Sequence, residues 1–166
     1  MENTKRIYFK NNRKLLKYML LKEHEWYLYC FQKKLRAEEH AINTFSRFIH
    51  RMNKNRIGAK LGIYIPAGVF DEGLHIWHYG NIIVNAESKV GKNCMLHGDN
   101  CIGNNGKDEG CPIIGDNVDI GTGAKILGSI QIANGVKIGA GAVVVNSCLV
   151  ENATIVGIPG KEIIRK

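Results

Sequence analysis

Aliphatic residues return at every sixth position along the second half of the chain. The series is Val84, Val90, Leu96, Ile102, Ile114, Ile120, Ile126, Ile132, Ile138, Val144, Val150 and Val156, and only Asp108 interrupts it. This period is too long for a helix and too sparse for an ordinary alternating strand, whereas short strands joined by tight turns fit it. Each unit can bury its apolar residue only by stacking on its neighbours. The pattern therefore predicts an all-β solenoid.

The preceding region has a helical pattern instead. Residues 10–52 contain neither Gly nor Pro and carry apolar residues at helix-like intervals. We expect two helices joined either near residues 21–25 or near residues 38–43, with Asn43 and Thr44 able to cap a later helix. Gly58 ends this pattern. The predicted organisation is a helical segment over residues 1–56 and a solenoid over residues 57–166.

Two segments break the six-residue period. A first set of repeats, Ile57, Ile63 and Val69, runs in a different phase, and the offset contains a stretch rich in His and aromatic residues at 73–80. The second break covers residues 103–113, where Asp108 and Pro112 occupy inward positions, so this segment is predicted to leave the wall as a loop. Loops on a rigid scaffold often contact substrates. A tolerated insertion is the alternative.

Charge divides unevenly between the two regions. The formal charge is +8, but residues 1–56 hold 14 Lys and Arg against 5 acids, and residues 57–166 hold 9 against 10. The nearly neutral solenoid does not indicate a nucleic-acid partner. The basic segment could make weak contact with an anionic membrane surface, although a solvated helical face is the ordinary explanation.

Cysteine usage and hydropathy indicate the compartment. The 5 cysteines show neither zinc-site spacing nor a paired framework, which is typical of a reducing environment. The sequence shows no apolar run long enough for a membrane span and no signal-peptide core. We expect a cytoplasmic protein.

The region from Ile57 to Arg165 resembles the left-handed β-helix hexapeptide acyltransferases. Within that group it is similar to serine acetyltransferases and to O-acetyltransferases of bacterial surface polysaccharides. The resemblance rests on the stretch at 73–80, on Ile-Gly-Thr-Gly-Ala at 120–124 with Ile-Gly-Ala-Gly-Ala at 138–142, and on the closing motif at 156–161. It implies a left-handed parallel β-helix that assembles as a homotrimer, with acetyl-CoA between neighbouring subunits and no metal requirement.

The resemblance also implies roles for individual residues. His78 matches the catalytic position, where a histidine can act as general base near neutral pH, and His97 matches a second position one layer away. Thr122 and Ala140 match residues that line the pantetheine arm of the cofactor. The remaining candidates are Lys161 and, more weakly, Arg165 for the CoA phosphates, and Trp77, Tyr79, Asn104 and Cys111 for the acceptor.

Three departures from the serine acetyltransferase pattern concern the acceptor. Trp77 and Ile65 stand where acids are expected, and Cys111 stands where a loop histidine is expected. Loss of the acids disfavours an amino-acid acceptor, because an ammonium group would lose its carboxylate partners. Exposed aromatic faces suit sugar rings. The sequence thus predicts acetyl transfer to a sugar hydroxyl of a surface polysaccharide or its precursor.

Three alternatives remain beside this prediction. The first is serine O-acetyltransferase activity with a rearranged site. The second, a β-helical carbonic anhydrase, needs three zinc-binding histidines including a close pair, and Ile102 stands where one is needed. The third is a non-catalytic scaffold that uses its basic segment to bind a partner, although a scaffold needs no combination of His78, the loop and the closing motif.

Overall fold

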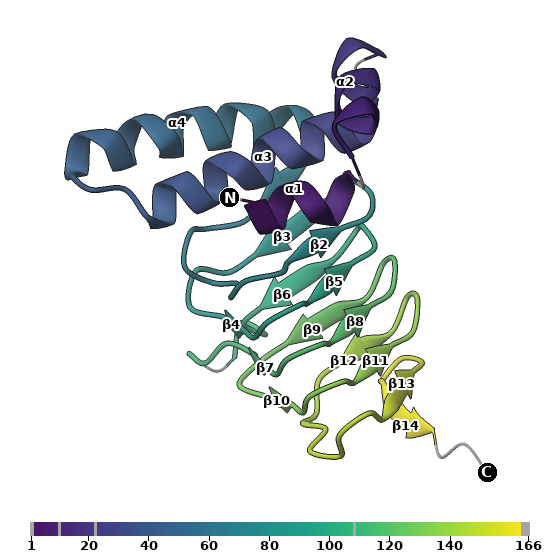
Figure 1. The fold of residues 1–166 in the computed structure, drawn as a ribbon. Coiled ribbons are helices and arrows are strands. Elements are labelled where there is room, and N and C mark those ends of the chain that lie inside the picture. Colours follow the sequence, from purple (N-terminus) through teal and green to yellow (C-terminus); the bar gives the residue numbers. More distant parts are fainter. Residues whose placement is uncertain (1, 10, 22, 108, 164–166) are drawn as a thin grey trace.

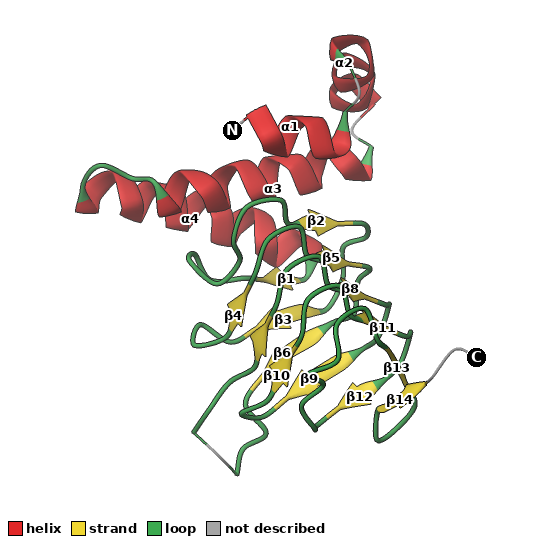
Figure 2. Ribbon diagram, turned by 60° about the horizontal axis from the view of Figure 1, so that its bottom comes forward, coloured by secondary structure: helices red, strands yellow, loops and turns green. Residues whose placement is uncertain are grey.

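The computed structural model describes residues 2–9, 11–21, 23–107 and 109–163. Helices α1 (Glu2–Tyr8), α2 (Asn12–Leu21), α3 (His24–Glu39) and α4 (Thr44–Leu61) come first and lie across one end of a three-sided β-helix (Figure 1). Figure 2 shows the short strands of the β-helix below the paired helices α3 and α4. The architecture matches the predicted order of a helical segment followed by a solenoid.

The two junctions that were predicted as alternatives are both present, so α2, α3 and α4 replace the two predicted helices. Asn43 is the N-cap of α4, and its side chain accepts a hydrogen bond of 2.8 Å from the Ser46 amide, as expected for a capping Asn. The predicted end at Gly58 is wrong, because Gly58 lies inside α4. A Cβ atom there would lie 2.4 Å from the Ile63 carbonyl oxygen, so this glycine allows close packing rather than ending the helix.

The β-helix consequently starts later than predicted. Ile57 belongs to α4, which ends at Leu61 and is followed by the C-cap Gly62, a residue with a left-handed φ of 66°. The first strand, β1, begins at Ile63.

Three sheets form the faces of the prism. The first contains β1 (Ile63–Tyr64), β3 (Ile82–Val84), β6 (Cys101–Gly103), β9 (Lys125–Leu127) and β12 (Val143–Val144) in that order. The second contains β4 (Lys89–Val90), β7 (Ile113–Ile114) and β10 (Gln131–Ile132). The third contains β2 (His75–Ile76), β5 (Met95–Leu96), β8 (Asp119–Ile120), β11 (Lys137–Ile138), β13 (Thr154–Val156) and β14 (Lys161–Ile163). Every pairing is parallel except the antiparallel pair β13–β14, which closes the prism.

The register confirms the predicted stacking of coils. Val84 pairs with Ile102, and Ile120 pairs with Ile138, so residues 18 positions apart lie on adjacent layers. Ile102 pairs with Ile126, 24 positions away, because the loop between β6 and β7 adds residues to one coil. The predicted excursion at 103–113 is therefore present, although Gly103 and Ile113 themselves belong to strands; Asp108 lies outside the described residues.

The core consists of the periodic aliphatic side chains, with an exception in the last coil. Ile102, Ile120 and Ile126 are at most 1% exposed. Val150 and Val156 were expected inside but are 57% and 38% exposed. Cys148 and Ile155 occupy the inward positions instead, pairing with Ile132 and Ile138 respectively. The last coil is shorter, which shifts the period by one or two residues.

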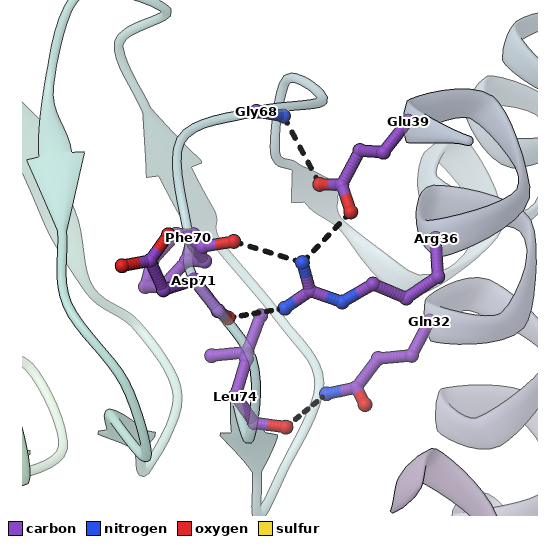
Figure 3. A network of polar contacts seen from close by, with 7 residues as sticks. All are labelled: Gln32, Arg36, Glu39, Gly68, Phe70, Asp71 and Leu74. Carbon is purple, nitrogen blue, oxygen red and sulfur yellow. Dashed lines mark hydrogen bonds and ion pairs between the residues drawn. The ribbon is translucent and has the colours of Figure 1, made fainter. Parts of the chain in front are cut away.

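Polar contacts fix α3 to the first coil (Figure 3). Gln32 donates to the Leu74 carbonyl at 3.0 Å, and Arg36 donates to the carbonyls of Phe70 and Asp71. Nearby, Lys54 of α4 donates to the Ile65 carbonyl at 2.9 Å. These side chains donate to carbonyl groups at the end of the β-helix, where no further coil is present to donate backbone hydrogen bonds to them. The helices thereby cap the solenoid.

Within the described part of the chain, no helix is both long and apolar enough to cross a bilayer.

Candidate active site

One corner of the prism collects most of the residues that the sequence singled out. The turns after β2, β5, β8, β11 and β13 lie in successive layers, and we call them the stacked corner (residues 77–80, 97–99, 121–123, 139–141 and 157–160). Backbone hydrogen bonds join these turns, including Gly123 N to Gly98 O at 3.0 Å and Gly141 N to Thr122 O at 2.8 Å. His78, His97, Thr122 and Ala140 all lie in this column.

His78 lies at the helical end of the stacked corner. Its side chain is exposed, and Gly98 lies directly beneath it in the next layer. A Cβ atom on Gly98 would lie 3.4 Å from the His78 carbonyl oxygen and 3.5 Å from the His78 Cβ, and the φ of Gly98 is +102°. Only glycine takes this conformation readily. The turn therefore keeps the layers close and leaves the His78 ring accessible.

His97 is held more firmly than His78. Its Nε2 lies 2.8 Å from Oδ1 of Asp119, and both side chains are about one-third exposed, at 33% and 31%. The His97 ring also stacks on Trp77, with 5.7 Å between centroids and 17° between planes. The carboxylate and the indole together fix the ring orientation.

Trp77 is the centre of this aromatic stack. Its other neighbour is His75, at 4.3 Å between ring centroids, and burial together with the nearby His97 lowers the pKa of His75. Trp77 and Tyr79 remain 43% and 51% exposed. Ile65, in contrast, is 1% exposed. Ile65, the second residue that stands where an acid is expected, therefore packs in the core and adds no surface to this site.

Small residues make a ledge along the rest of the stacked corner. Thr122 and Ala140 are exposed in adjacent layers, and Thr122 Oγ1 donates to the His97 carbonyl at 3.2 Å. A Cβ atom on Gly121 would lie 2.7 Å from the Ala140 amide nitrogen. The small side chains leave room for an extended ligand along this ledge. The exposed Lys161 begins β14 at the far end, and Arg165 lies outside the described residues.

Asn104 and Cys111 lie elsewhere in the chain. Their loop follows β6, and Gly110 in it lies against Ser129, which follows β9. The stacked corner precedes β6 and β9, so the loop is at the opposite end of these strands. Within a single subunit, the fold does not bring Asn104 and Cys111 to His78.

The sequence did not reveal two other residues at this site. His24, the first residue of α3, places its ring 5.9 Å from the His78 ring and 6.3 Å from the Tyr79 ring, measured between centroids. Asp119 contacts His97 across 22 residues of sequence. A strand alignment that counted the additional residues of the longer coil could have placed Asp119 next to His97. Nothing in the sequence indicated which end of α3 would reach the corner.

Among the described residues, no group of three or more His, Cys, Asp or Glu side chains is positioned to hold a metal ion.

Comparisons with known proteins point to one family. No protein-family model matches the chain. A serine acetyltransferase of Synechococcus elongatus is 32% identical over 139 residues, which cover 82% of this chain and 52% of the relative. The soybean serine acetyltransferase apoenzyme superposes with a TM-score of 0.70 at 27% identity, covering 83% of this chain and 58% of that one. The Neisseria gonorrhoeae serine acetyltransferase gives a TM-score of 0.65 at 29% identity, covering 86% and 55%.

The relative and the structural neighbours indicate the hexapeptide-repeat acyltransferase family. Within that family it is similar to serine acetyltransferases, and its parallel β-helix is left-handed as theirs is, which confirms the predicted fold class. The chain spans about half the length of the relatives it matches, between 52% and 58% in these three cases.

Proposed function

We propose that this protein transfers an acetyl group from acetyl-CoA to a hydroxyl group. The observation that carries the proposal is the stacked corner, where an exposed histidine adjoins a ledge of small residues. The relatives are named serine acetyltransferases, which supports an acetyl-CoA donor. Thr122 and Ala140 would border the pantetheine arm, and Lys161 would meet the CoA phosphates by charge attraction.

The chemistry needs one base and no covalent intermediate. His78 takes the proton of the acceptor hydroxyl while that oxygen attacks the thioester carbonyl. The tetrahedral intermediate collapses, the carbon–sulfur bond breaks, and the leaving CoA thiolate takes a proton from the His78 imidazolium. His97, fixed by Asp119 at 2.8 Å, orients the acceptor from the adjacent layer. Holding both substrates in one groove supplies the proximity effect.

The complete site requires a neighbouring subunit in this proposal. We expect a homotrimer, in which the groove between prisms covers the ledge of one subunit with a face of the next. The loop after β6 is at a different corner from His78 in its own chain, so Asn104 and Cys111 would contact acceptor bound to a neighbour.

For the acceptor, the comparisons favour L-serine. All the relatives described above are serine acetyltransferases, and another soybean serine acetyltransferase structure, at 27% identity and a TM-score of 0.70, was solved with serine bound. Serine O-acetylation is thus the first candidate.

A specific observation favours a sugar hydroxyl as second candidate. Among the described residues, His78 has no hydrogen-bonded carboxylate, and the neighbouring position is Trp77, which is 43% exposed. The carboxylates paired with the other histidines of this site are Asp119, which is bound to His97, and Glu25, whose Oε2 lies 3.2 Å from His24 Nδ1. A serine ammonium group here would lose most of its hydration with little compensation. Trp77 and Tyr79 offer flat apolar surfaces instead.

A thiol-release assay separates the two acceptors. Full-length protein and acetyl-CoA are mixed with L-serine in one series, and with sugar nucleotides and oligosaccharides in another. Serine turnover without glycan turnover assigns serine acetylation, and the reverse result assigns a glycan acetyltransferase. Absence of acetyl-CoA binding by titration calorimetry would contradict the proposed donor.

A further inference from the structure

The beginning of the chain carries an unusual concentration of positive charge. Residues 3–22 contain seven basic residues and no acidic one, which we call the basic stretch. Its members are Lys5, Arg6, Lys10, Arg13, Lys14, Lys17 and Lys22. The candidate active site uses none of them. Because residues 57–166 are nearly neutral, with 9 basic residues against 10 acidic ones, the basic stretch dominates the charge asymmetry of the chain.

Helix α2, within the basic stretch, exposes an apolar stripe. Leu15 and Tyr18 are partly buried and pack toward the core, whereas Leu16, Met19 and Leu20 are 52%, 38% and 68% exposed. At about 100° per residue, these three side chains share one arc of the helix. No residue of α2 is buried. Against the described residues, the stripe therefore stays open to solvent.

Basic side chains border one edge of the stripe. Arg13 and Lys17 follow Leu20 around the helix at about 100° per residue, and both are exposed. Figures 1 and 2 show α2 standing out from the other helices at the end opposite the α3–α4 turn. Hence a flat surface could approach α2 without meeting the β-helix first.

We propose that α2 binds the surface of an anionic lipid bilayer. Leu16, Met19 and Leu20 insert at the boundary between headgroups and acyl chains, while Arg13 and Lys17 contact anionic headgroups. A short amphipathic helix with basic flanks is suited to this position, and each Lys or Arg near an anionic membrane adds to the attraction. The helix lies on the membrane and does not span it.

Two other partners fit the surface less well. Nucleic acid would use the charge of the basic stretch but gains little from exposed leucines. A second copy of α2 would cover the leucines but would bring two sets of like charges together without acids to compensate. A bilayer uses both features at once.

Binding of α2 to a membrane would also affect the position of the candidate site. Helix α2 ends at Leu21 and α3 begins at His24, whose ring is 5.9 Å from the His78 ring between centroids. Membrane-bound α2 would therefore place the helical end of the stacked corner beside the bilayer surface. The binding proposal itself does not depend on the acetyltransferase activity.

Vesicle co-sedimentation of the full-length protein tests the proposal. Vesicles of phosphatidylglycerol with phosphatidylcholine are compared with vesicles of phosphatidylcholine alone. We expect binding only to the anionic vesicles and its loss at high salt. The charge variant Arg13→Gln/Lys17→Gln should bind about 30-fold more weakly, at about fivefold per charge. The apolar variant Leu16→Asn/Leu20→Asn should bind at least about 10-fold more weakly.

Matched variants on α4 serve as controls. Phe45 and Phe48 are 75% and 60% exposed, so Phe45→Asn/Phe48→Asn removes apolar surface away from α2. Arg56→Gln/Lys60→Gln removes two exposed charges. Both controls should bind anionic vesicles within about twofold of the wild type, and circular dichroism should show unchanged helix content in all variants.

Several results would overturn the proposal. They are equal binding to neutral vesicles, equal loss in the α4 controls, and binding to an RNA or DNA oligonucleotide but not to vesicles. A change of oligomeric state in Leu16→Asn/Leu20→Asn, seen by sedimentation velocity without vesicle binding by the wild type, would assign the stripe to a second copy.

Discussion

Replacing Asp119 with Asn should slow acetyl transfer without unfolding the protein. Asp119 accepts a hydrogen bond from His97 across 2.8 Å. A charge-assisted hydrogen bond contributes about 1.5–3 kcal/mol. Both side chains are about one-third exposed, at 33% and 31%, so solvent screening reduces this to about 1–1.5 kcal/mol. The expected loss in kcat/KM is therefore about 5- to 10-fold.

The assay follows thiol release at varied acceptor and saturating acetyl-CoA. If Asp119 positions His97 toward the acceptor, Asp119→Asn should change the kinetic constants for the acceptor and leave acetyl-CoA affinity unchanged. Asp119→Glu keeps the carboxylate and should recover part of the loss. Glu151→Gln, an exposed change outside the stacked corner, is the matched control. Equal kinetics for Asp119→Asn and wild type would refute the positioning argument, as would a loss shared with Glu151→Gln.

Three further predictions concern the ledge, the loop and the capping helices. Gly121→Val places a Cβ atom 2.7 Å from a backbone nitrogen, so calorimetry should show weaker acetyl-CoA binding or a lower Tm; no change in either would contradict the ledge. Cys111→Ser should keep most of its activity, and mass spectrometry with acetyl-CoA alone should find no acetyl group on the Cys111 peptide, because direct transfer needs no acyl-enzyme. Lys54→Met should lower the free energy of unfolding by about 2–4 kcal/mol in urea, because it removes a partner 2.9 Å from the buried Glu38. Burial would raise the pKa of Glu38, but hydrogen bonds from Arg51 and Lys54 lower it. This stabilisation is therefore present above the unfolded-state pKa of Glu38 and is lost as the pH falls through its folded-state pKa. Equal acid sensitivity of the wild type and Glu38→Gln would refute this.

Most of the fold could be predicted from the six-residue period, because this period shows directly which residues stack on one another. Once residues 18 apart lie on adjacent layers, Thr122 and Ala140 must be neighbours, and the hydrogen bond from Gly141 N to Thr122 O shows that they are. The inward positions of the aliphatic series were predicted wrongly in the last coil. Its aliphatic residues continue the period in sequence, but a shorter turn makes Cys148 the inward residue in place of Val150.

The surroundings of the candidate base were harder to predict than its position. Tertiary docking decides which groups reach His78, and periodicity within a helix does not specify the docking. His24 comes to His78 because Gln32 and Arg36 anchor α3 on the carbonyls of the first coil. Such contacts depend on backbone groups at the end of the β-helix, which have no signature in the sequence.

His78→Ala tests the central claim most directly. With the acceptor identified by thiol release, kcat is measured beside the affinity for acetyl-CoA from calorimetry. Our account predicts that kcat falls by about 10²-fold or more, with acetyl-CoA affinity almost unchanged, because only the proton acceptor is removed. Near-normal turnover by His78→Ala would contradict the assignment of His78 as the base and, with it, the proposed role of the stacked corner.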